Sequence, residues 1–349
     1  MSSLGISGSS SATLWSTVTK NLLRVSVNWK CPEGDFEEFT SNNDDVILRS
    51  IAEDLRLSLP TDAILNSEHL PLQKLQEQTK PTVHIDAFLY DDDYIDSLCE
   101  RGKMSRNYCL TCGSHQTAPL EFISHSFSLM EVKFLYQHVL PDLTGKVLVD
   151  VGSRLGVVLF GGYFYSSASQ LYGVEINADF CQLQEAITAK YQLCDRVKVV
   201  NADICTQASL LQNADVVIMN NVFEYFLDRS EQARCWEFIY QNVRKKGSLL
   251  VTIPSLEKSF SDLQIIPQLG EGSRHILRET IANLVLPVGT NIYRVVHMRE
   301  EDPVRDLDPN NVNIQLNQWV EAVPLDYDVF LEVDADREAL EEIYLYKIL

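Results

Sequence analysis

The sequence predicts a doubly wound α/β fold, with a mostly parallel seven-stranded sheet that carries helices on both faces. Two observations predict this architecture. From Lys146 onward, short apolar runs rich in Val, Ile and Leu alternate with segments of helical periodicity, which is the pattern of buried parallel strands joined by crossover helices. The chain, at 349 residues, is also long enough to bury a large core, either as one domain or as a domain with an added cap.

Five apolar runs predict the parallel strands of this sheet. They are KVLVDVG, QLYGVEIN, VKVVNAD, DVVIMNN and SLLVTIP. We expect helices between them at about 156–167, 178–192 and 229–245, where apolar residues recur at helical spacing. The last two strands are expected at about 328–333 and 342–348, joined by a short link as a C-terminal antiparallel edge hairpin.

The residues before the sheet predict a smaller, mixed N-terminal cap. Residues 1–25 include a Ser- and Gly-rich stretch that we expect to be a flexible tail. We assign 26–142 to the cap or lid region and 143–349 to the sheet domain. Pro141 supports this boundary, because proline ends the helix predicted just before the sheet.

Periodicity predicts three elements within the cap. Apolar residues at helical spacing predict helices over 43–57 and 127–140. Alternation of apolar and polar residues predicts a strand over 83–90.

The composition is that of an ordinary globular protein, with 45% hydrophobic and 22% charged residues. No apolar run approaches the roughly 20 residues of a membrane-spanning helix, so we expect no membrane partner. The eight cysteines mostly stand singly in apolar or helical stretches, which favours a reducing compartment over a disulfide framework. We therefore expect a cytoplasmic protein, with the nucleus as the alternative.

The net charge of -20 lies on the flanks of the chain. Residues 146–298 carry 14 Lys+Arg and 15 Asp+Glu, whereas 1–145 carry 11 and 20, and 299–349 carry 4 and 14. Acidic flanks would repel a phosphate backbone, which argues against a nucleic-acid partner and favours a neutral or cationic one. A solvated surface that only promotes solubility is the alternative.

Three acids end three successive predicted strands: Asp150, Glu175 and Asp203. Ligands in such sheets bind at the carboxyl ends of the strands, so we expect the three carboxylates to line one crevice. Glu175 can accept hydrogen bonds from ribose hydroxyls, and Asp203 can reach an adenine amino group. Gly152 in the first turn and Gly156 at the start of the next helix would let the backbone approach a ligand closely.

The first turn distinguishes between nucleotides. A dinucleotide fingerprint has a second glycine where this sequence has Arg154. Asp150 places a negative charge beside the turn, which is unfavourable for a pyrophosphate and favourable for the ammonium group of a methionine moiety. The turn therefore favours S-adenosylmethionine over NAD.

The run from 146 to 254 resembles the class I, Rossmann-like S-adenosylmethionine-dependent methyltransferase family. Five motifs in order carry the resemblance: VLVDVGSRLG, YGVEIN, VVNADI, DVVIMNNVFEYF and VRKKGSLLVTIP. The resemblance implies that 143–349 is a methyltransferase domain with S-adenosyl-L-methionine as its cofactor. Arg154 and Val157 replace small residues common in the first motif. The fourth motif lacks a DPPY-type or NPPY-type signature, which disfavours an amino-group nucleic-acid methyltransferase.

The resemblance also implies roles for the site residues. Asp150, Gly152 and Gly156 would hold the methionine part of the cofactor, Glu175 the ribose, and Asp203 with Ile204 the adenine. The segment from Asn220 to Glu224 would lie beneath the sulfonium, with Asn220 and Asn221 among the cofactor-binding residues.

The acceptor side is expected where the fourth motif meets the segment 124–127. We expect Glu224 to hold a cationic amine or accept its proton, His125 to act as a base and Tyr225 to orient the sulfonium. A charge that only satisfies backbone donors at a helix N-terminus is the alternative for Glu224, and ordinary packing is the alternative for His125.

Three functions follow from these residues. The favoured one is transfer of a methyl group to a protein side chain or a small molecule. The alternatives are a catalytically inactive cofactor-binding regulatory or scaffold subunit, and a nicotinamide-dependent oxidoreductase. The sequence leaves the acceptor and the oligomeric state open.

A cysteine-rich segment of the cap offers a weaker zinc hypothesis. Cys109, Cys112 and His115, with Cys99 or His125, could supply a tetrahedral site. A single CxxC lacks the second paired unit of a convincing zinc site, so we favour free thiols and expect no metal.

Overall fold

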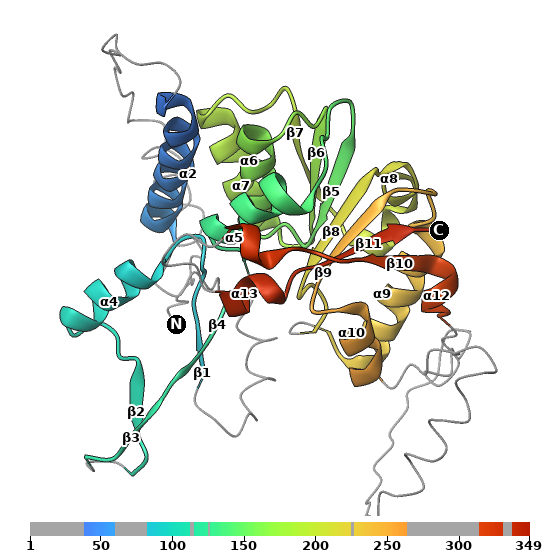
Figure 1. Cartoon of the computed structure of the whole chain (residues 1–349). Helices are drawn as coiled ribbons and strands as arrows, with labels where there is room; N and C mark the ends of the chain where they lie inside the picture. Colours follow the sequence, from blue (N-terminus) through green and yellow to red (C-terminus); the bar gives the residue numbers. More distant parts are fainter. Residues whose placement is uncertain are drawn as a thin grey trace, which may run out of the picture.

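The computed structural model describes residues 38–59, 82–111, 115–124, 126–224, 227–263, 314–330 and 337–349. A seven-stranded sheet forms its centre (Figure 1). The strands are β5 (Val147–Val151), β6 (Gln170–Glu175), β7 (Val197–Asn201), β8 (Val216–Asn220), β9 (Leu249–Ile253), β10 (Val320–Val323) and β11 (Tyr344–Ile348). Their order is β10-β11-β9-β8-β5-β6-β7. The predicted fold class is confirmed.

The five apolar runs all form parallel strands, as predicted. β5 pairs with β6 and β8, β6 with β7, and β8 with β9, each in parallel register. From β5 the chain first adds β6 and β7 on one side of the sheet and then crosses to β8 and β9 on the other. The switch point of the sheet therefore lies between β5 and β8, and open α/β sheets bind ligands at the carboxyl ends of the strands there.

The C-terminal pair differs in part from the prediction. β11 lies within the predicted range 342–348, but residues Tyr327–Phe330 form a 3-10 helix, and the partner strand is β10 at Val320–Val323. The buried Trp319 fixes β10 beside the core, because its indole N–H donates to the carbonyl of Val243 at 2.8 Å. β11 is antiparallel to both β10 and β9, so it is the one reversed strand of the sheet.

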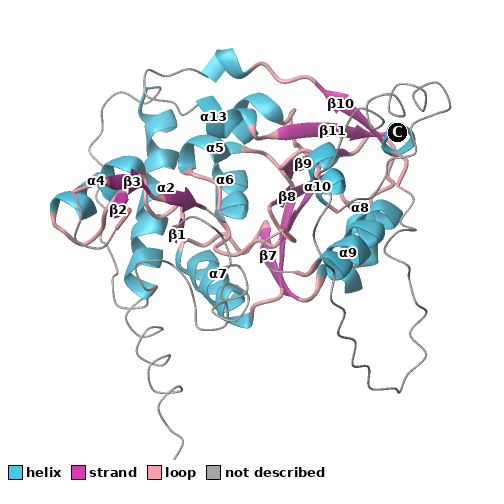
Figure 2. Ribbon diagram, turned by 90° about the horizontal axis from the view of Figure 1, so that it is seen from below, coloured by secondary structure: helices cyan, strands magenta, loops and turns pink. Residues whose placement is uncertain are grey.

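Helices cover both faces of the sheet (Figure 2). On one face lie α6 (Val157–Tyr165) and α7 (Ala178–Lys190); on the other lie α8 (Ala208–Asn213), α9 (Arg229–Asn242) and α10 (Leu256–Asp262). Alternation along β5 divides the core accordingly: Leu148 packs in the cluster of α6 and α7, whereas Val149 and Val151 pack in the cluster of α9 and α10. Two short helices, α12 (Leu316–Trp319) and α13 (Arg337–Glu341), flank the C-terminal strands.

The N-terminal segment is mixed α and β, as predicted. Its elements are α2 (Glu38–Ser58), β1 (Thr82–His84), α4 (Asp92–Glu100), β2 (Asn107–Cys109), β3 (Thr117–Pro119), β4 (Glu121–Ile123), α5 (Leu129–Phe134) and the π-helical turn η1 (Leu135–Val139). β1 pairs in parallel with β4, and the β2–β3 hairpin extends away from the large sheet (Figure 1).

The strand predicted over 83–90 is too long. It ends at His84 because Asp86 turns the chain: its carboxylate accepts hydrogen bonds from the backbone N–H groups of Phe88 and Leu89 at 3.1 and 3.2 Å. The predicted helix 127–140 corresponds to α5 and η1, and α5 begins with a capping box of Ser128 and Glu131.

The N-terminal helix α2 packs on the sheet domain. Leu48, Ile51 and Leu55 belong to the same buried cluster as Leu159 of α6. The segment therefore shares one hydrophobic core with that face of the sheet. No helix among the described residues is long and apolar enough to cross a membrane.

Candidate active site

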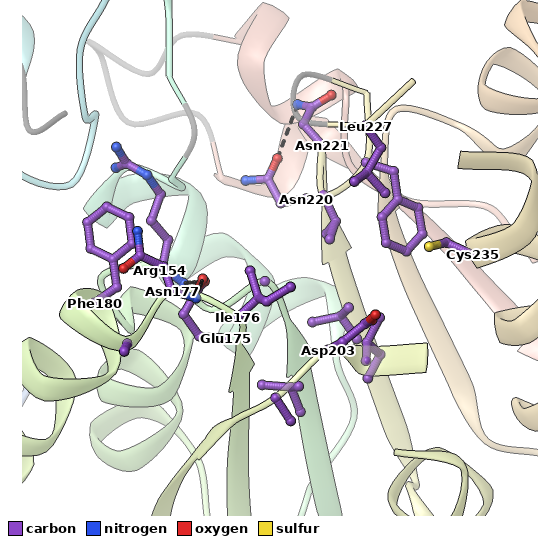
Figure 3. A pocket seen from close by; sticks show the side chains of 18 of the residues that line it. Arg154, Glu175, Ile176, Asn177, Phe180, Asp203, Asn220, Asn221, Leu227 and Cys235 are labelled. Atoms are coloured by element: carbon purple, nitrogen blue, oxygen red, sulfur yellow. Dashed lines mark hydrogen bonds between the residues drawn. The ribbon is translucent and has the colours of Figure 1, made fainter. Parts of the chain in front are cut away.

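A cavity of about 610 Å³ opens at the carboxyl ends of β5, β6, β7 and β8 (Figure 3). This volume lies within the roughly 300–1,000 Å³ typical of small-molecule sites. Of the predicted cofactor residues, six line the cavity: Gly152, Glu175, Asp203, Ile204, Asn220 and Asn221. The topology of the sheet brings them together, because each follows or ends a parallel strand.

The turn after β5 has a conformation that glycine allows. Gly152 has φ +71°, and a Cβ there would come within 3.0 Å of Val222 Cγ1 on the opposite wall of the cavity. Gly156 has φ +82° at the N-terminus of α6, and a Cβ there would meet the Phe160 ring at 2.9 Å. Gly156 is thus required for packing and does not line the cavity.

Glu175 is a cavity carboxylate that backbone hydrogen bonds hold at both of its oxygens. It is buried at the end of β6, and its two oxygens accept hydrogen bonds from the backbone N–H groups of Arg154 at 2.9 Å and Asn177 at 2.8 Å. A carboxylate oxygen can accept more than one hydrogen bond, so these backbone contacts are compatible with binding of a diol. It is fixed before any ligand binds, as an efficient binding group should be.

Asp203 lies beyond the end of β7 and faces the same cavity (Figure 3). It caps the 3-10 helix η2 (Ile204–Thr206), because its side chain accepts a hydrogen bond from the backbone N–H of Cys205 at 2.8 Å. The buried Ile204 follows it and adds an apolar surface to the wall. A carboxylate beside an aliphatic side chain suits a flat base that carries an amino group.

Asp150 is placed behind the wall and does not line the cavity. It is 4% exposed, on the face of β5 that packs against α6 and α7. Burial raises the pKa of Asp150 well above its usual range, and the nearby charge of Glu175 raises it further. Its predicted contact with the methionine part of the cofactor therefore remains a prediction.

Arg154 joins the cavity to the N-terminal segment, a role that the sequence did not reveal. Its guanidinium lies over the Phe180 ring at 5.0 Å, and its Nη1 donates to Asp86 Oδ2 at 2.6 Å. Both side chains of this ion pair are buried. Ser126 also donates to Asp86, at 2.6 Å. We call Arg154, Asp86 and Ser126 the clasp.

The opposite wall comes from the segment after β8. Asn221 has φ +46°, its backbone N–H donates to the carbonyl of Ile253 at 2.7 Å, and its side chain donates to Asn220 Oδ1 at 3.2 Å (Figure 3). Val222 and Phe223 continue this wall. The turn after β8 is therefore held by the end of β9 through its backbone, and its two amide side chains bond each other.

The predicted catalytic residues are only partly described. Glu224 is half-buried and does not line the cavity; its Oε1 accepts a hydrogen bond from Ser259 of α10 at 3.1 Å. Its Oε2 accepts from the backbone N–H of Phe223 at 3.1 Å. Tyr225 and His125 lie outside the described residues.

The zinc hypothesis is not tested in full. Within the described ranges, no group of three or more His, Cys, Asp or Glu side chains could hold a metal ion. Cys109 is an exposed free thiol, while Cys112 and His125 lie outside the described residues.

Residues 149–251 match a family model described as a methyltransferase domain. The match runs from β5 to β9 and contains every residue that lines the cavity. No curated protein matches this chain.

Several solved structures are similar in fold. One is an S-adenosylmethionine-dependent O-methyltransferase from Thermotoga maritima, with 17% identity and a TM-score of 0.32 over 40% of this chain and 51% of that one. Another is an RNA methyltransferase from Salinibacter ruber in complex with S-adenosyl-L-homocysteine, with 19% identity and a TM-score of 0.26 over 31% and 65%. A third is precorrin-6y C5,15-methyltransferase from Geobacter metallireducens, with 14% identity and a TM-score of 0.30 over 40% and 71%. The chain spans about half the length of the first and under two thirds of the second. At these scores the similarity does not bear on the acceptor.

Proposed function

We propose that this chain is a class I S-adenosylmethionine-dependent methyltransferase, which uses S-adenosyl-L-methionine as its cofactor and transfers a methyl group to a protein side chain or a small molecule. The observation that carries the proposal is the cavity at the strand ends, where Glu175 ends β6 and Asp203 follows the adjacent strand β7.

The cavity wall fits an adenosine. Both oxygens of Glu175 are already oriented by backbone donors, so the ribose hydroxyls would find acceptors without rearrangement. Asp203 and Ile204 offer an acceptor and an apolar surface further along the wall. A Cβ at position 152 would meet Val222 at 3.0 Å, so glycine keeps this part of the cavity free of a side chain and leaves the backbone of the turn exposed to a ligand.

The cofactor supplies an electrophilic methyl group, and the protein positions it. Methyl transfer is an in-line displacement, so most of the rate can come from holding the nucleophile about 3 Å from the methyl carbon and from excluding water. Asn220 and Asn221 lie at the end of β8, where we place the reactive end of the cofactor. We assign the acceptor contacts to Glu224, Tyr225 and His125, with Glu224 holding or deprotonating an amine.

We propose that the acceptor is neutral or cationic. Residues 1–145 and 299–349 together carry nearly all of the net negative charge of -20, and this charge would disfavour the approach of a polyanion. The N-terminal region 26–142 acts as the cap over the 143–349 domain, with the clasp as its point of attachment beside the cavity. We place the enzyme in the cytosol or the nucleus on its single cysteines.

The test is to incubate the purified chain with methyl-labelled S-adenosylmethionine and cell extract. We expect the label to enter the protein or small-molecule fraction. The matched pair Glu175→Ala and Glu185→Ala controls for specificity, because Glu185 is an exposed residue of the neighbouring helix α7. Glu175→Ala should abolish labelling, and Glu185→Ala should leave it unchanged.

Two results would contradict the proposal. Labelling mainly of RNA or DNA would contradict the argument from charge. Cofactor binding without label in any fraction would contradict turnover and point to a regulatory subunit.

A further inference from the structure

Two cysteines face each other at one wall of the cavity. Cys235, on α9, is 3% exposed and lines the cavity (Figure 3). Cys205 lies in η2, directly after Asp203 and Ile204. The Sγ atoms are 3.3 Å apart, and the Cys205 thiol donates a hydrogen bond to Cys235. Both are free thiols.

The surroundings favour a reactive thiolate at Cys235. The hydrogen bond from Cys205 lowers the pKa of Cys235 against the opposing effect of burial, and the neighbouring Arg234 guanidinium lowers it further. The same hydrogen bond raises the pKa of Cys205. The pair thus has one sulfur suited to attack an oxidant and a second sulfur poised to resolve the product.

We propose that Cys205 and Cys235 form an oxidation site, at which hydrogen peroxide converts the two thiols to a disulfide that weakens cofactor binding. Formation of the disulfide depends on the position of the two thiols and not on the proposed function. The effect on cofactor binding does depend on the function proposed above. The cavity gives the oxidant access, because Cys235 lines it. A bound cofactor should therefore shield the pair.

The chemistry takes two steps. The Cys235 thiolate attacks one peroxide oxygen, so an S–O bond forms, the O–O bond breaks and hydroxide leaves as water after taking a proton. The Cys205 sulfur then attacks the sulfenic sulfur, so the S–S bond forms, the S–O bond breaks and a second water leaves with the Cys205 proton. Two thiols are oxidised by two electrons in total, and one peroxide is reduced to two waters. A dithiol reductant reverses the change.

The disulfide would act on the cavity through η2. A disulfide bond is about 2.0 Å long, so the sulfurs must approach by roughly 1 Å from their present separation. That movement draws η2 toward α9 and displaces Asp203 and Ile204, which precede Cys205 and line the cavity. Displacing binding groups by such a distance is enough to weaken a preorganised site.

Peptide mapping tests the disulfide directly. The full chain is reduced, desalted, treated with a small excess of hydrogen peroxide, alkylated and digested with trypsin. We expect the peptide 199–229, which contains Cys205, to be linked to 235–244, which contains Cys235, with a mass two hydrogens below their sum. Cys194→Ser, which removes an exposed thiol elsewhere, should give the same linked peptide. If both cysteines of the pair are alkylated while Cys194 is oxidised, the site does not exist.

Calorimetry with S-adenosylhomocysteine tests the consequence. Oxidation should weaken binding about tenfold in the parent chain and in Cys194→Ser, and a dithiol should restore it. In Cys205→Ser the same treatment should give no such reversible loss. A linked peptide with unchanged affinity would overturn the coupling. Should the reduced chain fail to bind the cofactor at all, the proposed function fails, while peptide mapping still decides whether the disulfide forms.

Discussion

The two halves of the cavity wall differ in how their polar groups are held. In the cofactor half, formed by the turn after β5 with Glu175 and Asp203, each carboxylate accepts hydrogen bonds from backbone N–H groups. The acceptor half is formed by Asn220–Phe223, where Asn221 donates to its neighbour Asn220. Glu224, which follows, turns toward α10. Backbone N–H groups thus orient both carboxylates of the cofactor half, whereas in the acceptor half the two amide side chains bond each other and the backbone of Asn221 is held by the carbonyl of Ile253.

The largest expected effect concerns the clasp behind the cofactor half. Asp86→Ala leaves the Arg154 guanidinium buried without its partner, and removing one member of a buried ion pair costs about 3 kcal/mol or more. Asp96→Ala is the matched control, because its ion pair with Arg106 is just as short, at 2.7 Å, but exposed. Urea unfolding should show a loss below about 1 kcal/mol for the control. Equal losses in the two variants would show that the clasp does not support the cofactor half.

Glu175→Ala should weaken cofactor binding about 100-fold. The substitution removes charge-assisted hydrogen bonds to the ribose, each worth about 1.5–3 kcal/mol, and frees the backbone donors that hold the turn. Calorimetry measures the affinity, and the unfolding midpoint confirms that the variant is folded. Glu185→Ala should bind within about twofold of the parent chain, since tenfold corresponds to about 1.4 kcal/mol and no such contact is lost.

Asp203→Asn tests whether Asp203 and Glu175 contribute equally to cofactor affinity. The amide oxygen can still cap η2, but the charge is gone and one carboxylate acceptor is lost. We expect about tenfold weaker cofactor binding, equivalent to one hydrogen bond of about 1.4 kcal/mol. A loss as large as that of Glu175→Ala would mean that the two carboxylates do not differ in importance.

Asp150→Asn should affect stability and binding in opposite directions. Burial raises the pKa of Asp150 in the folded chain. As pH rises above about 4, the unfolded chain loses this proton while the folded chain keeps it. The aspartate therefore destabilises the fold increasingly until the pH reaches its raised pKa. The variant should therefore gain free energy of unfolding relative to the parent, and the gain should be larger at pH 8 than at pH 4.

The same variant should bind S-adenosylmethionine more weakly if Asp150 pairs with the ammonium group of the cofactor. A difference in stability that does not grow with pH would contradict the burial argument. Unchanged binding would remove Asp150 from the cofactor half.

The smallest expected effect concerns the acceptor half. Glu224→Gln should lower turnover about fivefold and leave cofactor affinity within about twofold, because the side chain does not line the cavity. Ser259→Ala removes the hydrogen bond to Glu224. It therefore distinguishes a positioning role of Glu224 from direct contact with the acceptor. An equal loss in kcat would make Glu224 a positioning residue, whereas a smaller loss supports contact with the acceptor. Lost cofactor affinity with normal turnover at saturation would contradict the division into two halves.

Much of the sheet could be predicted from the sequence because buried parallel strands are locally encoded as apolar runs. β10 could not be predicted in this way, because its exposed residues Glu321 and Ala322 interrupt any apolar run. This edge strand is defined by its pairing with β11. The run at 328–333 suggested a strand, yet its first part folds as a 3-10 helix. Local pattern alone does not determine which segment pairs at a sheet edge.

The cofactor half followed from the sequence because topology brings the ends of parallel strands together. The clasp and the thiol pair did not, because they join residues that are 68 and 30 positions apart and depend on packing between elements. Arg154 was visible as a departure from small residues in the first motif, but its partner Asp86 was not. An arginine in place of a small residue beside a binding turn is the signal that could have prompted a search.

The nucleotide that the cavity binds decides the proposed function. Calorimetry of the parent chain with S-adenosylhomocysteine and, separately, with NAD tests it, because the two share an adenosine and differ in the group that would lie beside the turn of Gly152 and Arg154. We predict saturable binding of one S-adenosylhomocysteine per chain that Glu175→Ala and Asp203→Asn both weaken, and no binding of NAD. Binding of NAD in preference, or cofactor affinity unchanged in both variants, would contradict the assignment of this cavity.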